Sequence, residues 1–297
     1  MPEGDVVLRT ARRLTLALAE GELVRSELRW PTLAGNDLTG LRSLGTVSYG
    51  KNLLTRFSDG RTLHTHLRMD GTWRVTATPA EVDDRAGHGD IGVRRSAGGR
   101  PRDRRERGRY GRGPRTYDPA AAGSDVRAVL ATASWTCTGH QLGMMHLLRT
   151  HDESRLLAPL GPDVLGDTYD ADVEAAIGEA IHAQGAREIG AVLLDQGVLA
   201  GLGTIYMAET LFRHKVSPWR AAADVPDPAA MSATARRLML GSADAPTGPN
   251  TRGSIAMVTY GRSGEPCVRC TTPIRDGRVG EPPYDRIAYY CPRCQLR

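Results

Sequence analysis

Lysine is almost missing from this chain of 297 residues, whose 39 basic side chains include only Lys51 and Lys215. Arginine can replace lysine where positive charge alone is needed, so a retained lysine is a candidate for a specific role. Long apolar runs are missing too, and none approaches the roughly 20 residues of a membrane-spanning helix. The start of the chain, with Glu3, Asp5 and Arg9, lacks the cationic and then apolar segment of a secretory signal. We therefore expect a cytoplasmic protein without a membrane partner.

Cysteine is also scarce, and five residues in a cytoplasmic chain argue against a disulfide framework. Four of them form two close pairs with the spacing of metal ligands: Cys267-x2-Cys270 and Cys291-x2-Cys294. Such pairs are typical of one structural zinc ion closed in by four thiolates. The residues between the pairs can form a β-hairpin with Arg286 on its second strand. Cys137, in an apolar run, is expected to be a small buried side chain.

The net charge of +5 is concentrated in one segment. Eleven arginines and three acidic residues lie between Arg85 and Arg115, a local balance of +8, so the rest of the chain carries about −3. Residues 83–122 are rich in Arg, Gly and Pro and have too few apolar side chains to fold alone, so we expect a disordered insertion. It is either a solvated surface loop or an arm that adds nonspecific DNA affinity.

The hydrophobic pattern divides the chain into a β-rich part and a helical part. A leading helix with Asp5 as its N-cap is expected up to about residue 20, and its apolar stripe is Val7, Ala11, Leu14 and Leu18. Alternating apolar residues then predict strands over residues 23–28, 45–49, 53–57, 62–67, 71–77, 125–138 and 142–148. Helical periodicity follows over residues 171–184, 188–194, 204–214 and 228–240.

These elements predict an α+β chain of more than one domain. Residues 1–158 would form a β-sandwich behind the leading helix, residues 159–253 a helical domain that ends in a Pro/Gly-rich connection over 245–253, and residues 254–297 a zinc-finger β-hairpin module. Within the helical part, residues 193–206 indicate helix, glycine-rich turn and helix. Such a turn can aim backbone amides at a phosphate, although a plain helix hairpin in a core gives the same pattern.

The first residues have chemistry of their own. Once Met1 is removed, Pro2 is a secondary amine beside the carboxylic acid of Glu3. Such an amine titrates near neutrality and can attack a sugar carbon to form an iminium. Proline in this position is often only a start-of-chain residue, so the pair gains meaning from other motifs.

Six segments in fixed order provide those motifs. They are Pro2-Glu3-Gly4, Gly50-Lys51-Asn52-Leu53-Leu54, His66-Leu67-Arg68-Met69-Asp70-Gly71, the 193–206 run, Tyr260-Gly261-Arg262-Ser263-Gly264-Glu265-Pro266-Cys267 and Arg286-Ile287-Ala288-Tyr289-Tyr290-Cys291-Pro292-Arg293-Cys294-Gln295. Together they resemble the formamidopyrimidine-DNA glycosylase and endonuclease VIII family of base-excision repair enzymes. The resemblance spans the chain except for the Arg-rich insertion, and it implies that the 193–206 run is a helix-two-turn-helix.

The resemblance implies catalytic roles for four residues. Pro2 would attack C1′ of the damaged nucleotide, and Glu3 would protonate the opening sugar, so that strand cleavage by β,δ-elimination follows base loss. Lys51 would lie near the lesion phosphate and sugar. Arg286 would clamp the phosphates that flank the lesion.

The resemblance also implies DNA contacts. Met69 would fill the void left by the extruded nucleotide, whereas its alternative is a buried core methionine. His66 and Tyr260 match phosphate-contacting positions. Thr204 stands where the family usually has asparagine, and its hydroxyl could still cap a helix and meet a phosphate. Two further departures are Asp5-Val6 in place of the usual Pro-Glu and Thr271 in place of glycine.

We therefore expect a monomeric DNA glycosylase and abasic-site (AP) lyase that grips damaged double-stranded DNA, holds one structural zinc ion, needs no small-molecule cofactor and joins the nucleoid when bound. Pro2-Glu3-Gly4 favours endonuclease VIII-like enzymes and oxidised pyrimidines. His66-Leu67-x-Met69 favours the alternative, a formamidopyrimidine or 8-oxoguanine specificity. The rival from another class is a catalytically inactive, zinc-dependent protein that binds damaged DNA.

Overall fold

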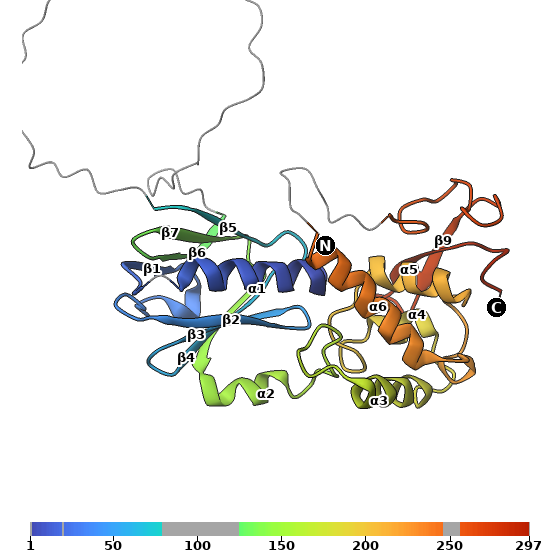
Figure 1. Ribbon diagram of the computed structural model, residues 1–297, viewed down its shortest axis with the longest axis horizontal. Helices are drawn as coiled ribbons and strands as arrows, with labels where there is room; N and C mark the ends of the chain where they lie inside the picture. The colour runs from blue at the N-terminus through green and yellow to red at the C-terminus, as the bar shows by residue number, and fades with distance from the viewer. Residues whose placement is uncertain (1, 20, 79–124, 246–255, 297) are drawn as a thin grey trace, which may run out of the picture.

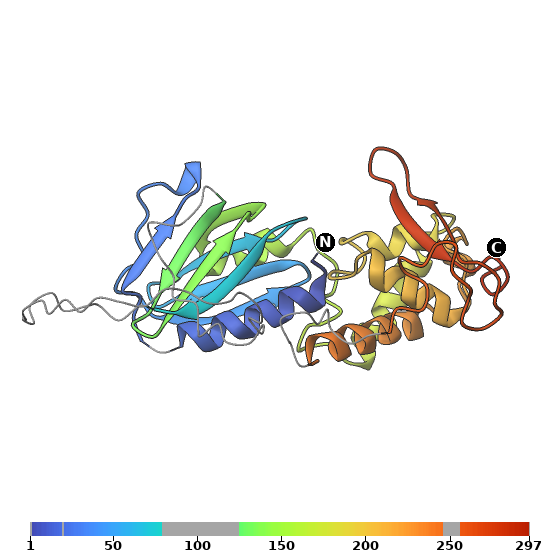
Figure 2. The ribbon, with the colours of Figure 1, turned by 90° about the horizontal axis from the view of Figure 1, so that it is seen from above.

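The computed structural model describes residues 2–19, 21–78, 125–245 and 256–296. The insertion expected at 83–122 and most of the connection expected at 245–253 lie outside the described residues. The described chain forms a β-rich half and a helical half, with the N-terminus at their junction and the C-terminus at the outer end of the helical half (Figures 1 and 2). This arrangement confirms the predicted α+β fold class.

The β-rich half is a sandwich of two four-stranded antiparallel sheets. One sheet has the order β1-β6-β7-β5, formed by Arg25–Leu28, Val126–Ala131, Trp135–His140 and Thr72–Ala77. The other has the order β2-β3-β4-β8, formed by Ser43–Tyr49, Asn52–Phe57, Arg61–His66 and Met144–Arg149. A short 3-10 helix, η1 (Pro31–Leu33), follows β1. The predicted segment 125–138 thus contains β6 and most of β7, with a tight turn between them.

Helix α1 (Gly4–Leu18) begins at the junction and runs along the sandwich away from the helical half (Figure 1). The four residues of its predicted apolar stripe are all buried in the sandwich core, where they join side chains such as Leu53 and Phe57. The predicted N-cap at Asp5 is wrong. The amides of Val6 and Val7 donate to the Glu3 carbonyl, so the helix begins at Gly4 and Glu3 is its N-cap.

Among the described residues, the helical half contains four α-helices of 6 to 16 residues, and two shorter helical segments beneath the sandwich lead into it (Figure 1). After η3 (Thr150–Asp152) and α2 (Glu153–Leu157) come α3 (Ala171–His182), α4 (Ile189–Leu194), α5 (Thr204–His214), η4 (Ala222–Asp224) and α6 (Pro228–Ala243). Asp170 and Asp227 cap α3 and α6, because their carboxylates accept the amides of Val173 and Ala230 at 2.9 Å. The four predicted helices are confirmed, whereas α2, with five residues, is too short to give a periodic signal.

The C-terminal module is a hairpin between the two cysteine pairs. Strands β9 (Arg275–Val279) and β10 (Arg286–Tyr290) pair antiparallel, and Arg286 is the first residue of the second strand, as predicted. The module packs on α5 through a small core of Phe212, Cys267, Ile274 and Cys291. Figure 2 shows its long connection standing above the helical half. Among the described residues, no helix combines the length and the apolar character needed to cross a membrane.

Candidate active site and nucleic-acid interface

A pocket of about 470 Å³ lies at the junction of the two halves. Its walls come from the start of the chain, the β2–β3 turn, the end of β4, the loop before α5 and the start of β10. The lining residues are Pro2, Lys51, His66, Arg68, Met69, Met144, Leu194, Gln196, Gly203, Thr204 and Arg286. Six of the predicted site residues therefore meet in one cavity, although they span almost the whole sequence.

Glu3 lies beneath this pocket and is only 1% exposed. Its carboxylate accepts the amides of Gly203 and Ile205, both at 2.9 Å, and more weakly that of Tyr206 at 3.5 Å. The Gly4 amide also donates to the Gly201 carbonyl at 3.0 Å. The start of α1 is thus fastened to the start of α5, and an added Cβ at Gly203 would meet the Glu3 carboxyl carbon at 2.4 Å.

These bonds bear on two expectations about the glycine-rich turn. The amides of Gly203 and Ile205 donate to Glu3 and are not free for a phosphate, whereas a phosphate site elsewhere on the turn stays a prediction. The N-cap of α5 is Gly203, without a side-chain capping bond, and Thr204 is the first helical residue instead of the cap. The predicted helix-turn-helix itself is confirmed by α4 and α5.

Burial raises the pKa of Glu3 to about 7, even though the Ile205 amide and the Lys51 ammonium favour its ionised form. A carboxyl group with this pKa is partly protonated at neutral pH. It can therefore deliver a proton under conditions in which an ordinary glutamate is fully ionised.

Lys51 lies at the tip of the β2–β3 hairpin, in a two-residue turn with Gly50. Gly50 has a φ of +56°, which suits the first position of such a turn, and a Cβ there would lie 2.9 Å from Ala200 Cβ. The Tyr49 hydroxyl donates to the Gly161 carbonyl at 3.0 Å. The turn is therefore docked on the loop that precedes α5 and on the segment between α2 and α3. Burial lowers the pKa of Lys51, an effect that Glu3 opposes and Arg286 reinforces.

His66 and Met69 form the side of the pocket that belongs to the sandwich. The Arg68 amide donates to His66 Nδ1 at 2.9 Å, so the neutral ring carries its proton on Nε2 and can donate it outward. Burial, with help from Arg68 and Lys51, lowers the pKa of His66 to about 4. The Met69 side chain is 62% exposed, so the alternative of a core methionine is wrong.

Arg286 and Tyr260 come from the C-terminal module. Arg286 is exposed, and its Nη1 donates to the carbonyls of Tyr284 and Asp285 at 2.7 and 2.9 Å. Tyr260 is not among the residues that line the pocket. Its ring meets Tyr289 edge to face, with the ring centroids 5.1 Å apart.

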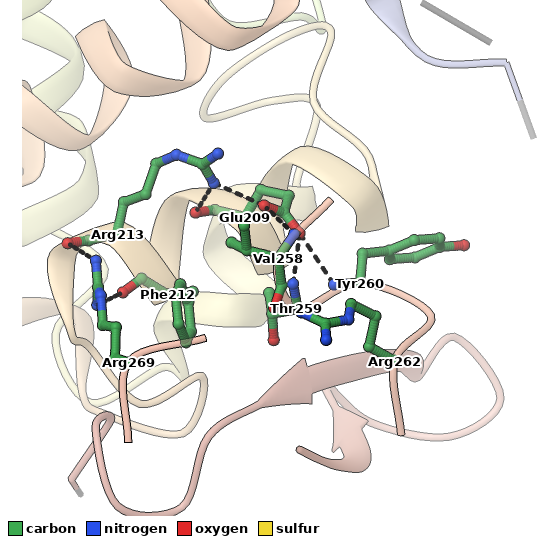
Figure 3. Close-up of polar contacts among 8 residues, drawn as sticks. All are labelled: Glu209, Phe212, Arg213, Val258, Thr259, Tyr260, Arg262 and Arg269. Carbon is green, nitrogen blue, oxygen red and sulfur yellow. Dashed lines mark hydrogen bonds and ion pairs between the residues drawn. The ribbon is translucent and has the colours of Figure 1, made fainter. Parts of the chain in front are cut away.

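Tyr260 is held in place by a buried acid that sequence reasoning missed. Glu209 of α5 is fully buried, and its Oε1 accepts the amides of Val258, Thr259 and Tyr260 at 2.9 to 3.0 Å (Figure 3). Its Oε2 accepts from Arg213 Nη1 at 2.6 Å. The signal was present in the sequence, since Glu209 interrupts an otherwise apolar side of α5.

Gln196 was missed as well, although it lies within a quoted motif. Its Nε2 donates to the carbonyls of Leu194 and Leu202, and its Oε1 accepts the Gly201 amide, all at 3.0 Å. These three bonds fold the loop between α4 and α5 around one side chain. Arg68, Met144 and Leu194 also line the pocket without having been assigned a role.

The four paired cysteines come together in the C-terminal module, with all four Sγ atoms within 4.8 Å of one another. Cys267 Sγ lies 4.0 Å from Cys294 Sγ, and Cys270 Sγ lies 3.5 Å from Cys291 Sγ. Four sulfurs at the usual Zn–S distance of about 2.3 Å around one tetrahedral ion would be about 3.8 Å apart, so the donor set and its spacing fit zinc. Cys137 is separate: it is buried in β7, and burial raises its pKa to about 12.

Comparisons with known proteins agree with this geometry. Residues 1–110 match the family model of the formamidopyrimidine-DNA glycosylase N-terminal domain, and residues 160–239 match that of the formamidopyrimidine-DNA glycosylase H2TH domain. The chain is 38% identical to a probable endonuclease 8 2 of Streptomyces coelicolor, with 99% of this chain and 94% of that protein covered. It is 31% identical to the DNA-(apurinic or apyrimidinic site) lyase Nei2 of Mycolicibacterium smegmatis, with 99% of each covered.

The fold is similar to that of solved structures as well. The formamidopyrimidine-DNA glycosylase of Lactococcus lactis, bound to DNA containing an AP site, superposes with a TM-score of 0.73 at 20% identity over the full length of both chains. The family is assigned from the relatives that match almost the full length of the chain at more than 30% identity. The chain belongs to the formamidopyrimidine-DNA glycosylase and endonuclease VIII family of DNA glycosylases and AP lyases.

Proposed function

We propose that the protein, after loss of Met1, is a bifunctional DNA glycosylase and AP lyase that removes oxidised bases from double-stranded DNA. The observation that carries this proposal is the pocket at the junction, where Pro2, Lys51 and Arg286 meet above the buried acid Glu3. A reaction at the sugar of a DNA strand needs an amine as nucleophile, an acid and cations that hold the phosphates, and this cavity brings such groups together.

The reaction follows from these groups. The Pro2 amine attacks C1′ of the lesion, the bond from C1′ to the base breaks, and the base leaves. Glu3 supplies the proton for the opening sugar ring, which leaves an iminium between Pro2 and C1′. The iminium acidifies the neighbouring sugar protons, so β- and δ-elimination then release the 3′ and 5′ phosphates.

The remaining residues would hold the DNA. Arg286 would exchange its two carbonyl partners for phosphates that flank the lesion, and neutral His66 would donate its Nε2 proton to a phosphate. Thr204 and Tyr260 are proposed as further DNA contacts. The exposed Met69 would enter the space that the extruded nucleotide vacates.

The four cysteines of the C-terminal module would hold one zinc ion. With four thiolates such a site is closed, so zinc would keep the β9–β10 hairpin and Arg286 in place and supply no chemistry to the reaction. The protein would work as a monomer without a small-molecule cofactor, on DNA in the cytoplasm.

Oxidised pyrimidines are the favoured lesions. The relative called probable endonuclease 8 2 matches at 38% identity over 99% of this chain. The formamidopyrimidine-DNA glycosylase of Variovorax paradoxus, which also covers 99% of this chain, matches at the lower identity of 31%. The alternative specificity for formamidopyrimidine and 8-oxoguanine is supported by His66 and Met69.

Borohydride trapping on a duplex with an abasic site tests the proposal. The processed protein should form a covalent adduct with the DNA. Pro2→Gly, which has a primary amine in place of the secondary one, and a form that retains Met1, in which the Pro2 nitrogen is part of an amide, should form far less adduct while still binding the duplex. Binding without any adduct from the processed protein would establish the inactive DNA-binding alternative instead. A panel of duplexes with oxidised pyrimidines or purines then ranks the lesions.

A further inference from the structure

Three polar side chains form a line of hydrogen bonds beside the turn that carries Lys51. His146 Nδ1 lies 3.2 Å from His64 Nδ1, and His64 Nε2 lies 2.9 Å from Asn52 Oδ1. The Asn52 amide nitrogen in turn donates to the Tyr49 carbonyl at 3.1 Å. The line therefore ends on the backbone of the Tyr49 to Asn52 turn.

The direction of each bond in this line is fixed by chemistry. The Tyr49 carbonyl can only accept, so the Asn52 group facing it is the amide nitrogen and the group facing His64 is the oxygen. His64 must then donate from Nε2. Its neutral ring accepts at Nδ1, so His146 donates from Nδ1. Each member thus has one defined tautomer or orientation.

The position of His64 is fixed by the sheet. It lies in β4 directly opposite Leu54 of β3 and His146 of β8, and it is only 1% exposed. Its ring stacks on that of His146, with centroids 5.4 Å apart. Because the His64 side chain is confined in this way, it can hold the start of β3 at Asn52 in one position.

We propose that His64 is a positioning residue for Lys51, which it orients by holding Asn52 and, through Asn52, the carbonyl side of the turn. The proposal rests on the role of Lys51 in the proposed function. The other side of the turn is already held by the contact of Gly50 with Ala200 and the bond from Tyr49 to Gly161. The His64 line is the second anchor, and with both in place the tip of the hairpin has a single orientation.

Two polar replacements separate the hydrogen bond from simple packing. In His64→Gln, the side-chain amide nitrogen can reach Asn52 as Nε2 does. In His64→Asn, the shorter side chain can accept from His146 but cannot reach Asn52. The proposal predicts that the Gln variant behaves as the wild type and the Asn variant does not. Thermal unfolding of both variants checks that each is folded.

The first readout is NMR of the free protein, which does not depend on catalysis. Nitrogen-15 spectra should show His64 as the neutral Nε2–H tautomer. Because Lys51 and Lys215 are the only lysines, carbon-13 lysine labelling gives two side-chain signals, of which Lys215 is an internal control. The Lys51 signal should shift or broaden in the Asn variant and stay unchanged in the Gln variant.

The second readout is the single-turnover rate of borohydride-trapped adduct on an abasic duplex, together with the Kd for a duplex containing a tetrahydrofuran abasic analogue. A displacement of about 1 Å at a reacting group can cost about 100-fold in rate, so we expect a 10- to 100-fold slower rate for the Asn variant, with Kd within about threefold. The Gln variant should remain within about threefold of the wild-type rate.

Equal rates and equal Lys51 signals in the two variants would overturn the proposal, as would a His64 that carries its proton on Nδ1. A wild-type protein that forms no adduct would instead overturn the proposed function. In that case the Lys51 signals of the two variants still decide whether His64 orients Lys51.

Discussion

Replacing Glu209 by alanine should loosen the C-terminal module from α5 without changing any residue that lines the pocket. The Glu209 carboxylate is fully buried and accepts three consecutive backbone amides and one guanidinium. A hydrogen bond to a charged group contributes about 1.5 to 3 kcal/mol, but such contributions do not add, and the Arg213 side chain is partly exposed. Removing one partner of a buried charged set usually costs about 3 to 5 kcal/mol, and we expect a loss in this range.

Hydrogen exchange of the Val258, Thr259 and Tyr260 amides measures this loss locally. In Glu209→Ala their opening free energy should fall by about 3 to 5 kcal/mol. Glu209→Gln is the matched control: it can keep an oxygen toward the three amides but places an amide group against Arg213. In Glu209→Gln the opening free energy of these amides should therefore fall by about half as much as in Glu209→Ala. Affinity for an abasic duplex should also fall more in the Ala variant than in the Gln variant, because Tyr260 belongs to this segment.

Unchanged exchange at these three amides in Glu209→Ala would refute the reasoning. It would mean that the segment is held by the metal site and the small core around Phe212 alone. Equal losses in the Ala and Gln variants would show that the Arg213 pair dominates over the amide bonds.

Three more predictions concern the pocket and the metal site. Burial raises the pKa of Glu3 from 4.5 to about 7, so between these pH values the folded state holds a proton that the unfolded state has lost. The free energy of unfolding, measured with urea and compared with that of Glu3→Gln, should therefore fall by about 3 kcal/mol between pH 4.5 and pH 7. Equal pH profiles of the two proteins would contradict the burial of the acid. Gly50→Ala should lower the free energy of unfolding by about 1 to 3 kcal/mol and slow adduct formation. The reason is that residue 50 has a positive φ and that its new Cβ would lie 2.9 Å from Ala200 Cβ. An unaffected variant would show that the turn can move away from the loop before α5. Zinc chelation should abolish the near-ultraviolet circular dichroism of Tyr289 and Tyr290 and the affinity for abasic DNA, while the sandwich stays folded. If the circular dichroism and the affinity both remain, the cysteine cluster holds no structural metal.

Periodicity was sufficient to predict the strands and the longer helices, because each buries one regular face of its own sequence. It could not predict where α1 begins, because that depends on the extended backbone at Glu3, which is set by contacts far along the chain. The spacing of the cysteines predicted the β9–β10 hairpin and the place of Arg286 correctly. This prediction was possible because the constraint on the chain is local: the two cysteine pairs and the hairpin between them must bring four sulfur atoms together.

Six of the eleven residues that line the pocket were named by resemblance, but the bonds that hold the site together were not. Glu3 binds amides about 200 positions away, and Glu209 binds amides about 50 positions away. The local sequence of Glu3 does not differ from that of an exposed glutamate, and the apolar neighbours of Glu209 in α5 indicate its burial but not its partners. Only the packing of α5 between the start of the chain and the C-terminal module reveals these contacts.

Glu3 would combine a proposed catalytic role with a structural one, and this combination limits what its replacement can show. As an acid it would protonate the sugar, and as an acceptor it joins α1 to the first turn of α5. Loss of activity in Glu3→Ala would therefore reflect both effects, since two buried amides would lose their partner. Glu3→Gln keeps one oxygen for one of these amides and removes the acid. A comparison of Gln with Ala measures the structural part, whereas Pro2→Gly replaces the secondary amine by a primary one and leaves the Glu3 carboxylate on α5.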